Sequence, residues 1–167
     1  MKRPVKTCFL LLGSNQEGRK NKLTRALTDL GRLPGCTVLR RSRFYETAAV
    51  GKKGKPYLNA AVEIKTSLSA MGLLIEAKRL EALAGRKPGP RWGPRPLDVD
   101  ILSFGRDKIL TRWLCVPHKL LTRRAFALAP LAELAPGWKP QGAATVAALL
   151  ARLNPSPGTV RIFLDDR

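Results

Sequence analysis

Two aspartates, Asp98 and Asp100, lie two positions apart in the stretch RWGPRPLDVDI, residues 91–101. They alternate with apolar residues, a pattern typical of a half-buried strand, so both carboxylates point to the same face. Aspartate is uncommon in strands, and two like charges on one face repel each other. Such a pair suits Mg²⁺, which takes one or two protein carboxylates and completes its shell with water and phosphate oxygens. The alternative is that the aspartates only form ion pairs with basic neighbours such as Arg91 or Arg95.

Other residues near this strand could bind phosphate. Arg91 and Arg95 carry guanidinium groups, and Trp92 adds an indole, so the loop could neutralise phosphates beside a metal ion. The alternative is a solvated basic loop whose tryptophan fills the edge of the core. The chain has one histidine, His118, which follows a proline and is either a hydrogen-bond donor to phosphate or an ordinary packed polar residue.

A second pair of residues could bind a flat heterocycle. Tyr57 and Asn59 fall on one face of a predicted strand, residues 57–66, because side chains alternate along a strand. An aromatic ring stacks on a planar ligand, and an amide forms paired hydrogen bonds with its edge. The alternative is an amide on a solvated strand face.

The composition restricts the class of protein. The chain has 167 residues with 44% hydrophobic residues, which is enough for one domain with its own core, so we expect a single domain over residues 1–167. Its 31 Lys and Arg against 12 Asp and Glu give a net charge of +19, which favours anionic partners: nucleic acid, anionic membrane or a polyphosphate ligand. Three cysteines without a Cys-x-x-Cys pair argue against a zinc site or a disulfide framework and for the cytoplasm. No segment has transmembrane length.

The elements that must position these residues follow the order strand, helix, strand, strand, helix, strand. This order predicts an α+β, ferredoxin-like βαββαβ sandwich: an antiparallel sheet with helices on one face and an open face for substrates, on which both aspartates would lie. The predicted strands are 7–12, 37–47, 57–66 and 97–104, and the helices are about 18–30 and 69–84, the second capped by Ser67 and ended by Gly85. Further predictions are a strand near 113–116, helices at about 121–134 and 143–152, and an unassigned apolar stretch at 160–164.

Seven stretches together resemble one enzyme family: LLLGSN (10–15), SRFYET (42–47), PYLNAAV (56–62), RLEALAGR (79–86), RWGPRPLDVDI (91–101), VPH (116–118) and RRAFALAPLAELAP (123–136). Their order and spacing are similar to those of the 6-hydroxymethyl-7,8-dihydropterin pyrophosphokinases over about residues 7–138, and the tail 139–167 is unassigned. The resemblance implies transfer of pyrophosphate from ATP to the hydroxymethyl group of the pterin, with release of AMP, in folate biosynthesis.

The resemblance also implies roles for individual residues. Asp98 and Asp100 would bind two Mg²⁺ ions and act in catalysis with Arg86 and Arg95. The implied ATP-binding residues are Glu81, Arg86, Trp92, Arg95, Ile101, His118 and Arg124. The implied pterin-binding residues are Thr47, Val50, Tyr57, Asn59, Trp92, Asp98 and Phe126, with Asn59 at the pterin edge and Tyr57 and Phe126 on its two faces. Lys78 stands where the family commonly has glutamine.

These expectations have two rivals. A palm-type nucleotidyltransferase could use paired aspartates on a similar sheet, but Tyr57, Asn59 and Phe126 suit a free heterocycle. A nucleic-acid-binding module would explain the net charge of +19, but the basic residues are dispersed, aromatic residues make up only 6%, and no motif of the common RNA-binding modules is present. We therefore expect a cytoplasmic monomer whose partners are ATP and the pterin, with no specific nucleic acid and no membrane.

Overall fold

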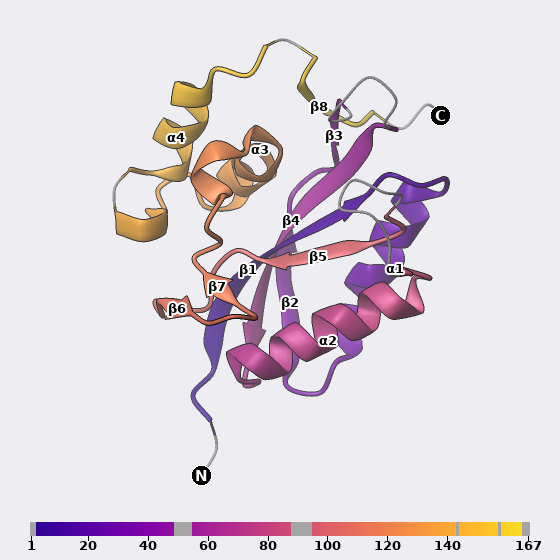
Figure 1. Cartoon of the computed structure of the whole chain (residues 1–167), viewed down its shortest axis with the longest axis vertical. Helices are drawn as coiled ribbons and strands as arrows, with labels where there is room; N and C mark the ends of the chain where they lie inside the picture. Colours follow the sequence, from indigo (N-terminus) through magenta and orange to yellow (C-terminus); the bar gives the residue numbers. More distant parts are fainter. Residues whose placement is uncertain (1–2, 49–54, 88–94, 143, 157, 165–167) are drawn as a thin grey trace.

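The central element is an antiparallel sheet (Figure 1). The computed structural model describes residues 3–48, 55–87, 95–142, 144–156 and 158–164. The strand order in the sheet is β5-β1-β4-β3-β8, with β2 pairing with β4 beside this path, and β6 and β7 form a separate ribbon. The strands are β1 (Lys6–Ser14), β2 (Cys36–Arg41), β3 (Tyr45–Thr47), β4 (Tyr57–Thr66), β5 (Asp98–Ile101), β6 (Ile109–Leu110), β7 (Cys115–Val116) and β8 (Val160–Ile162). The predicted order of strands and helices in the βαββαβ unit is confirmed.

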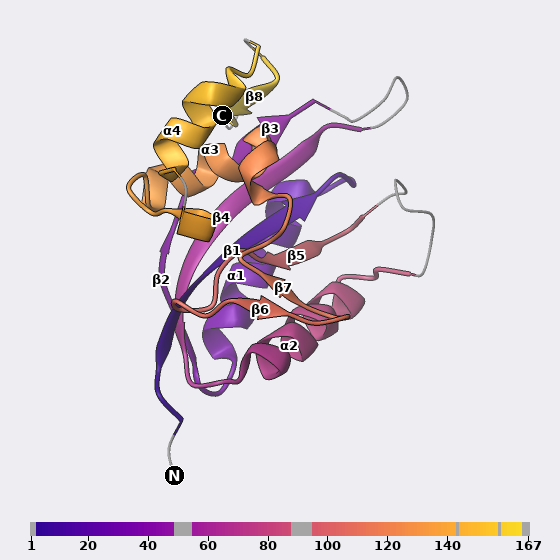
Figure 2. The same ribbon diagram turned by 60° about the vertical axis from the view of Figure 1, so that its left-hand side comes forward.

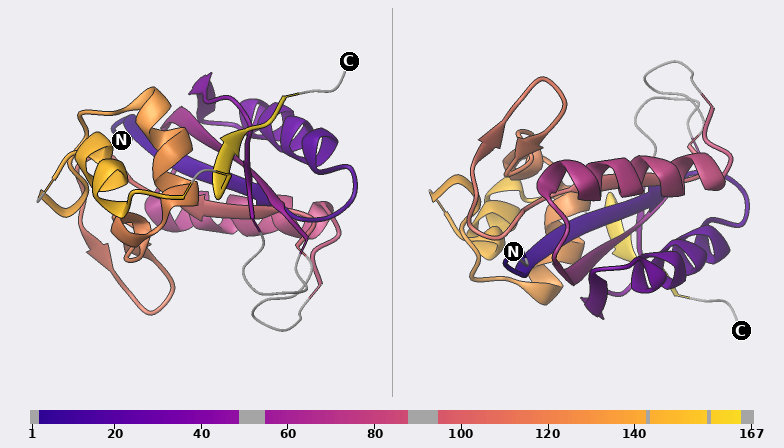
Figure 3. Two further views of the ribbon diagram at one scale, coloured as in Figure 1. Left: turned by 90° about the horizontal axis from the view of Figure 1, so that it is seen from above. Right: turned by 90° about the horizontal axis from the view of Figure 1, so that it is seen from below.

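Two helices cover one face of this sheet, α1 (Arg19–Arg32) and α2 (Ala70–Leu83) (Figures 1 and 3). Alternate residues of β1, including Leu10 and Leu12, point to this layer and share one buried cluster with Leu23 of α1 and Leu73 of α2. Burying a leucine side chain of this size stabilises the fold by about 1.5–3 kcal/mol. The cluster therefore holds the sheet and its two helices together.

The other face is covered in part. Leu11 and Ala61, which point away from α1 and α2, belong to a second cluster with residues of α3 (Ala125–Leu134) and α4 (Val146–Leu153) (Figure 2). The sequence predicted that this face would be open to substrates. Instead, α3 and α4 cover part of it, because their apolar residues are buried against the sheet. Asp98 and Asp100 occupy part of the same face, since Asp100 is in register with Leu11.

The predicted strand 37–47 is wrong in its extent, because the structure divides it into β2 and β3, which both pair with β4. The register with β4 shifts between Val38 and Arg40. Beyond β2, the hydroxyl of Ser42 accepts a hydrogen bond from the backbone N–H of Ala61 at 3.0 Å. A side chain thus replaces a backbone partner at this point, and the regular strand is interrupted.

The predicted helix cap at Ser67 is also wrong. Ser69 caps α2, and its Oγ accepts a hydrogen bond from the backbone N–H of Gly72 at 3.0 Å. Ser67 still belongs to the turn from β4, and its backbone N–H donates to the carbonyl of Gly35 at 2.8 Å. Both serines are plausible caps in sequence, and the path of this turn selects the second.

The C-terminal part of the chain adds elements that the sequence left open. The predicted helix 121–134 is a 3₁₀ turn, Leu121–Arg123, followed by α3, and the predicted helix 143–152 begins at Val146 as α4. A second 3₁₀ turn spans Pro140–Gly142, and the unassigned apolar stretch contains β8, which pairs with β3. Among the described residues, no helix is long and apolar enough to cross a bilayer.

Candidate active site

The register of the three central strands brings the predicted site residues to one face. Asp98 of β5 lies opposite Gly13 of β1, and Gly13 lies opposite Asn59 of β4. A Cβ atom at position 13 would lie 2.9 Å from Oδ1 of Asn59, closer than real Cβ contacts. A side chain at position 13 would displace the amide of Asn59, so glycine leaves room for this amide beside Asp98.

Asp98 is held by two guanidinium groups. Nη1 of Arg86 donates to its Oδ1 at 2.5 Å, and Nη1 of Arg95 donates to its Oδ2 at 2.9 Å. Burial raises the pKa of Asp98, but the charges of Arg95 and Arg86 outweigh burial and hold the pKa below its ordinary value. Asp98 is therefore ionised at neutral pH and lies where positive charge is already concentrated.

Asp100 has the opposite electrostatic environment. Burial and then the neighbouring Asp98 raise the pKa of Asp100, while His118 and Arg124 act against this. Burial in turn lowers the pKa of His118, which favours a neutral ring. Nδ1 of His118 accepts the backbone N–H of Leu120 at 3.3 Å, so the neutral ring carries its proton on Nε2. Nε2 is then a hydrogen-bond donor.

Glu81 connects α2 to β5 beneath these charges. Its side chain is only 3% exposed, its Oε1 accepts the backbone N–H of Val99 at 2.9 Å, and its Oε2 pairs with Nη1 of Arg86 at 2.6 Å. Lys78, one turn earlier on α2, donates to both carboxylate oxygens at 2.8 and 3.0 Å. Burial raises the pKa of Glu81, and Lys78 and Val99 oppose this effect. Glu81 thus orients Arg86 between two carboxylates, a role that sequence reasoning did not assign to Glu81 or Lys78.

The turn after β1 positions Arg95. Oδ1 of Asn15 accepts the backbone N–H of Arg95 at 2.7 Å, and the backbone N–H of Asn15 donates to the carbonyl of Arg95 at 3.2 Å. These reciprocal bonds fix the residue that precedes β5. The asparagine of the GSN motif therefore contributes to the site by holding Arg95.

The predicted pterin side lies on β3 and β4. Asn59 is 2% exposed, and its Nδ2 donates to Oγ1 of Thr47 at 3.1 Å. Tyr57 is half-buried on the same face of β4, and burial raises the pKa of its hydroxyl. Phe126 comes from α3, with the guanidinium of Arg124 at 5.5 Å from the centre of its ring. The structure thus brings an oriented amide and an aromatic ring to one strand, with a second ring on the helix that packs on β4.

Of the residues that the sequence predicts for the site, three lie outside the described part of the chain, and one points to the other face of the sheet. Val50 and Trp92 lie outside the described residues, as does Arg91. The side chain of Ile101 is 4% exposed and belongs to the core on the α1 and α2 side, so only its backbone could reach ATP. Because side chains alternate between the two faces of a strand, the sequence already places Ile101 on the face opposite the aspartates.

Asp98 and Asp100 are the residues of the site that could hold a magnesium ion. Within the described ranges, there is no group of three or more His, Cys, Asp and Glu side chains that could hold a metal by themselves. Two aspartates on one strand face are the oxygen ligands that Mg²⁺ uses when phosphates and water complete its shell. The donor set therefore suits a metal brought by a nucleotide.

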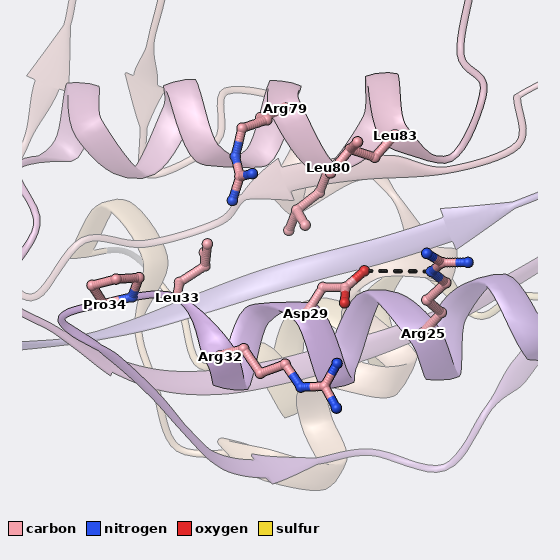
Figure 4. Close-up of a pocket in the computed structure, with 8 residues that line it drawn as sticks. All are labelled: Arg25, Asp29, Arg32, Leu33, Pro34, Arg79, Leu80 and Leu83. Carbon is pink, nitrogen blue, oxygen red and sulfur yellow. Dashed lines mark ion pairs between the residues drawn. The ribbon is translucent and has the colours of Figure 1, made fainter.

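A cavity of about 220 Å³ lies on the other side of the sheet, between α1 and α2 (Figure 4). Three arginines and one aspartate, Asp29, line this cavity. Asp29 forms an ion pair with Arg25 at 3.7 Å. The cavity is separated from Asp98 and Asp100 by the sheet itself, because these residues point to the opposite face. Its lining residues are Arg25, Asp29, Arg32, Leu33, Pro34, Arg79, Leu80 and Leu83.

Comparisons with known proteins agree with this geometry. Residues 9–136 match the model of the 7,8-dihydro-6-hydroxymethylpterin-pyrophosphokinase family. The chain is 40% identical over 149 residues to 2-amino-4-hydroxy-6-hydroxymethyldihydropteridine pyrophosphokinase of Methylorubrum extorquens, covering 89% of this chain and 94% of that relative. It is 44% identical over 127 residues to the Bacillus subtilis enzyme of the same name, covering 75% of this chain and 76% of the relative.

Solved structures support the fold. The wild-type Plasmodium falciparum HPPK-DHPS crystal structure with pterin and p-hydroxybenzoate superposes with a TM-score of 0.72 at 16% identity. The match covers 91% of this chain but 42% of that longer chain. At this identity the likeness shows the fold alone, and it agrees with the predicted ferredoxin-like architecture.

Proposed function

The chain belongs to the 7,8-dihydro-6-hydroxymethylpterin-pyrophosphokinase family, and on this premise we propose how its own residues divide the work. The reaction transfers pyrophosphate from ATP to the hydroxymethyl group of 6-hydroxymethyl-7,8-dihydropterin in folate biosynthesis and releases AMP. The observation that carries the assignment of roles is the pairing of Asp98 with Arg86 and Arg95, across Gly13 from Asn59. Family membership decides against the palm-type nucleotidyltransferase and the nucleic-acid-binding module.

Asp98 and Asp100 hold two Mg²⁺ ions in this proposal. Bound there, Mg²⁺ neutralises ATP phosphates and acidifies the pterin alcohol. The support is the donor set: two carboxylates lie on one face, and Asp98 is ionised because the charges of Arg95 and Arg86 lower its pKa although burial raises it. The raised pKa of Asp100 has burial and the charge of Asp98 as its causes, and added positive charge would lower it again.

The basic residues of the site bind and orient the phosphates. Arg86 and Arg95 already lie at the carboxylate of Asp98, so they are placed to neutralise phosphate oxygens brought to it. Nε2 of His118 is a donor to a phosphate oxygen, and Arg124 adds a further positive charge. Because phosphoryl transfer depends chiefly on positioning and charge stabilisation, these groups provide most of what the protein contributes.

The pterin lies between Tyr57 and Phe126, with the amide of Asn59 at its edge. The hydrogen bond from Nδ2 of Asn59 to Oγ1 of Thr47 holds the amide in one plane at this position on β4. A fixed amide recognises one arrangement of ring nitrogen and oxygen atoms. The pterin alcohol is thereby directed to the β-phosphorus of ATP for in-line attack.

We also propose that the whole chain is one domain and acts as a cytoplasmic monomer. Pairing of β8 with β3 makes the C-terminal segment part of the same sheet. The three cysteines, Cys8, Cys36 and Cys115, are free thiols, as in a reducing compartment. Light scattering of the purified protein at several concentrations tests the monomer, because a mass of twice 18.4 kDa would contradict it.

The decisive experiment is AMP formation from ATP with Mg²⁺, in the presence and absence of 6-hydroxymethyl-7,8-dihydropterin. We expect pterin-dependent AMP release that EDTA abolishes and that Asp98→Ala lowers roughly 10³-fold. Asp107→Ala is the matched control, because this aspartate pairs with Lys6 rather than with a site residue. Folded native protein that releases no AMP on addition of the pterin would overturn the proposed function.

A further inference from the structure

The C-terminal strand lies beyond residue 136, where the match to the family model ends, and it pairs with the strand that carries Thr47 (Figures 1 and 2). Glu46 of β3 is opposite Arg161 of β8. The backbone N–H of Ala48 donates to the carbonyl of Thr159 at 3.1 Å, and that of Phe163 donates to the carbonyl of Phe44 at 2.8 Å. Because β4 pairs with the other side of β3, this three-residue strand is held from both sides.

Side chains of β3 alternate between the two faces of the sheet. Tyr45 and Thr47 point to the face of the candidate site, where Thr47 accepts the hydrogen bond from Asn59. Glu46 points to the opposite face, toward the start of α1. Its side chain is 13% exposed and forms ion pairs with Arg19 at 2.6 Å and with Arg161 at 2.5 Å. A cluster of three charges thus lies behind the residue that contacts the amide, with Glu46 largely buried and Arg161 69% exposed.

Arg19 extends this cluster to the next strand. Its Nη1 donates to the carbonyl of Pro56 at 2.8 Å, and Pro56 immediately precedes Tyr57. The carboxylate of Glu46 is therefore linked through Arg19 to the start of α1 and to the start of β4. Through Arg161 it is linked to β8. Hydrogen bonds from Arg161 are the largest influence on the pKa of Glu46, and they lower it. Burial raises this pKa, but the charges of both arginines also lower it, so it stays below its ordinary value.

We propose that Glu46, Arg19 and Arg161 form a positioning cluster that sets the affinity for the pterin, and that the C-terminal strand contributes Arg161 to it. The cluster acts through Thr47: when β3 is held, Oγ1 of Thr47 accepts from Asn59 and the amide keeps one orientation. When β3 moves away from β4, Asn59 loses this partner, and its amide is no longer held in the plane that meets the edge of the pterin. This inference rests on the proposed role of Asn59 in binding the pterin.

The effect is confined to one substrate because the two sides of the site lie on different strands. Arg86 and Arg95 lie in the connection between α2 and β5, Asp98 lies in β5, and β5 is at the far edge of the sheet order from β3 and β8. The contacts of Glu81 also run to α2 and β5. Loss of the Glu46 cluster should therefore weaken pterin binding and leave ATP binding unchanged.

The test compares Glu46→Gln, Arg161→Ala and Arg161→Lys with native protein by measuring kcat and the KM of each substrate. We expect Arg161→Ala to raise the KM for pterin roughly fivefold and Glu46→Gln roughly tenfold, since the second change weakens contacts with both arginines. Arg161→Lys should recover part of the loss, because lysine keeps the charge but not the fork geometry. The control is Arg152→Ala, an exposed arginine of α4 in the same C-terminal segment.

The outcomes separate this inference from the proposed function. A selective rise in the KM for pterin, with the KM for ATP and kcat within about twofold of native, supports the inference. The inference is overturned if the KM values for pterin and for ATP change equally. It is also overturned if the KM for pterin is unchanged in both Arg161→Ala and Glu46→Gln. If native protein shows no pterin-dependent AMP release, the proposed function fails, and titration of pterin fluorescence then decides whether the cluster affects pterin binding alone.

Discussion

The two sides of the candidate site share one sheet face but are built from different interactions. On the ATP side, Arg86 links the carboxylates of Glu81 and Asp98, and Arg95 adds a second positive charge. On the pterin side, the central contact is the neutral hydrogen bond between Asn59 and Thr47. In the proposed function, the charged side binds the ATP phosphates, whose charge changes during the reaction, whereas the neutral side binds the pterin ring, whose charge does not change.

This difference predicts different sensitivities. Interactions among charges depend on ionic strength and on protonation, and removal of one charge leaves its buried partners uncompensated. A neutral amide contact depends mainly on orientation, so its loss should change the affinity for the pterin by a factor that salt hardly alters. Four substitutions test this contrast.

Arg86→Ala should have the largest effect. We expect kcat/KM to fall roughly 10²- to 10³-fold, because the guanidinium that faces the phosphates is lost and two carboxylates lose a shared partner. Steady-state assays of AMP release measure this change. Arg79→Ala is the control, since Arg79 lies on α2, the helix that leads to Arg86, and pairs with Glu76 at the surface. Similar losses in the two variants would contradict a specific role for Arg86.

Asn59→Ala should raise the KM for the pterin roughly 100-fold, because a site built to hydrogen-bond the ligand loses its donor and acceptor together. The ratio of mutant to native KM should be the same at low and at high salt. Asn21→Ala, on the exposed side of α1, is the control. A ratio that depends strongly on salt would show that the pterin side also relies on charge.

Glu81→Ala should lower the free energy of unfolding by about 2 kcal/mol, because the buried N–H of Val99 loses its acceptor and Arg86 loses one carboxylate. Urea denaturation followed by circular dichroism measures the change. Glu76→Ala, one turn earlier on α2, removes only a surface pair and should cost less than about 0.5 kcal/mol. Equal losses in the two variants would show that burial of Glu81 has no special effect.

Asp100→Asn should have the smallest effect on stability and the opposite sign, raising the free energy of unfolding by up to about 1 kcal/mol at pH 7. The pKa of Asp100 lies above its ordinary value of 3.8, so its ionised form is disfavoured in the folded protein. That cost is fully present above the folded pKa and vanishes below 3.8, where both states are protonated. Denaturation at pH 7 and at low pH measures it, and a gain that persists in acid would contradict this origin.

The same variant separates stability from function. Asp100→Asn removes a proposed magnesium ligand, so AMP release should fall although the protein is more stable. Magnesium with ATP should then stabilise native protein against heat more than the variant, because ligands stabilise the state that binds them. Equal stabilisation of the two proteins would argue against Asp100 as a ligand.

Local sequence patterns determined much of this protein. The alternation around Asp98 and Asp100 and that around Tyr57 and Asn59 each predicted a strand and the face of its polar residues, and the structure places all four on one face. This inference succeeds because side-chain direction in a strand depends only on the parity of the position. The family motifs then supplied the reaction.

Tertiary structure alone decided which groups meet. Arg86 reaches Asp98 across twelve positions, and Glu81 reaches the backbone of Val99, because α2 packs against β5. The division of one predicted strand into β2 and β3, and the pairing of β8 with β3, depend on register between distant segments. Such contacts are fixed by the path of the chain and by competition among many basic residues for few carboxylates, and neither is encoded in the spacing of neighbouring residues.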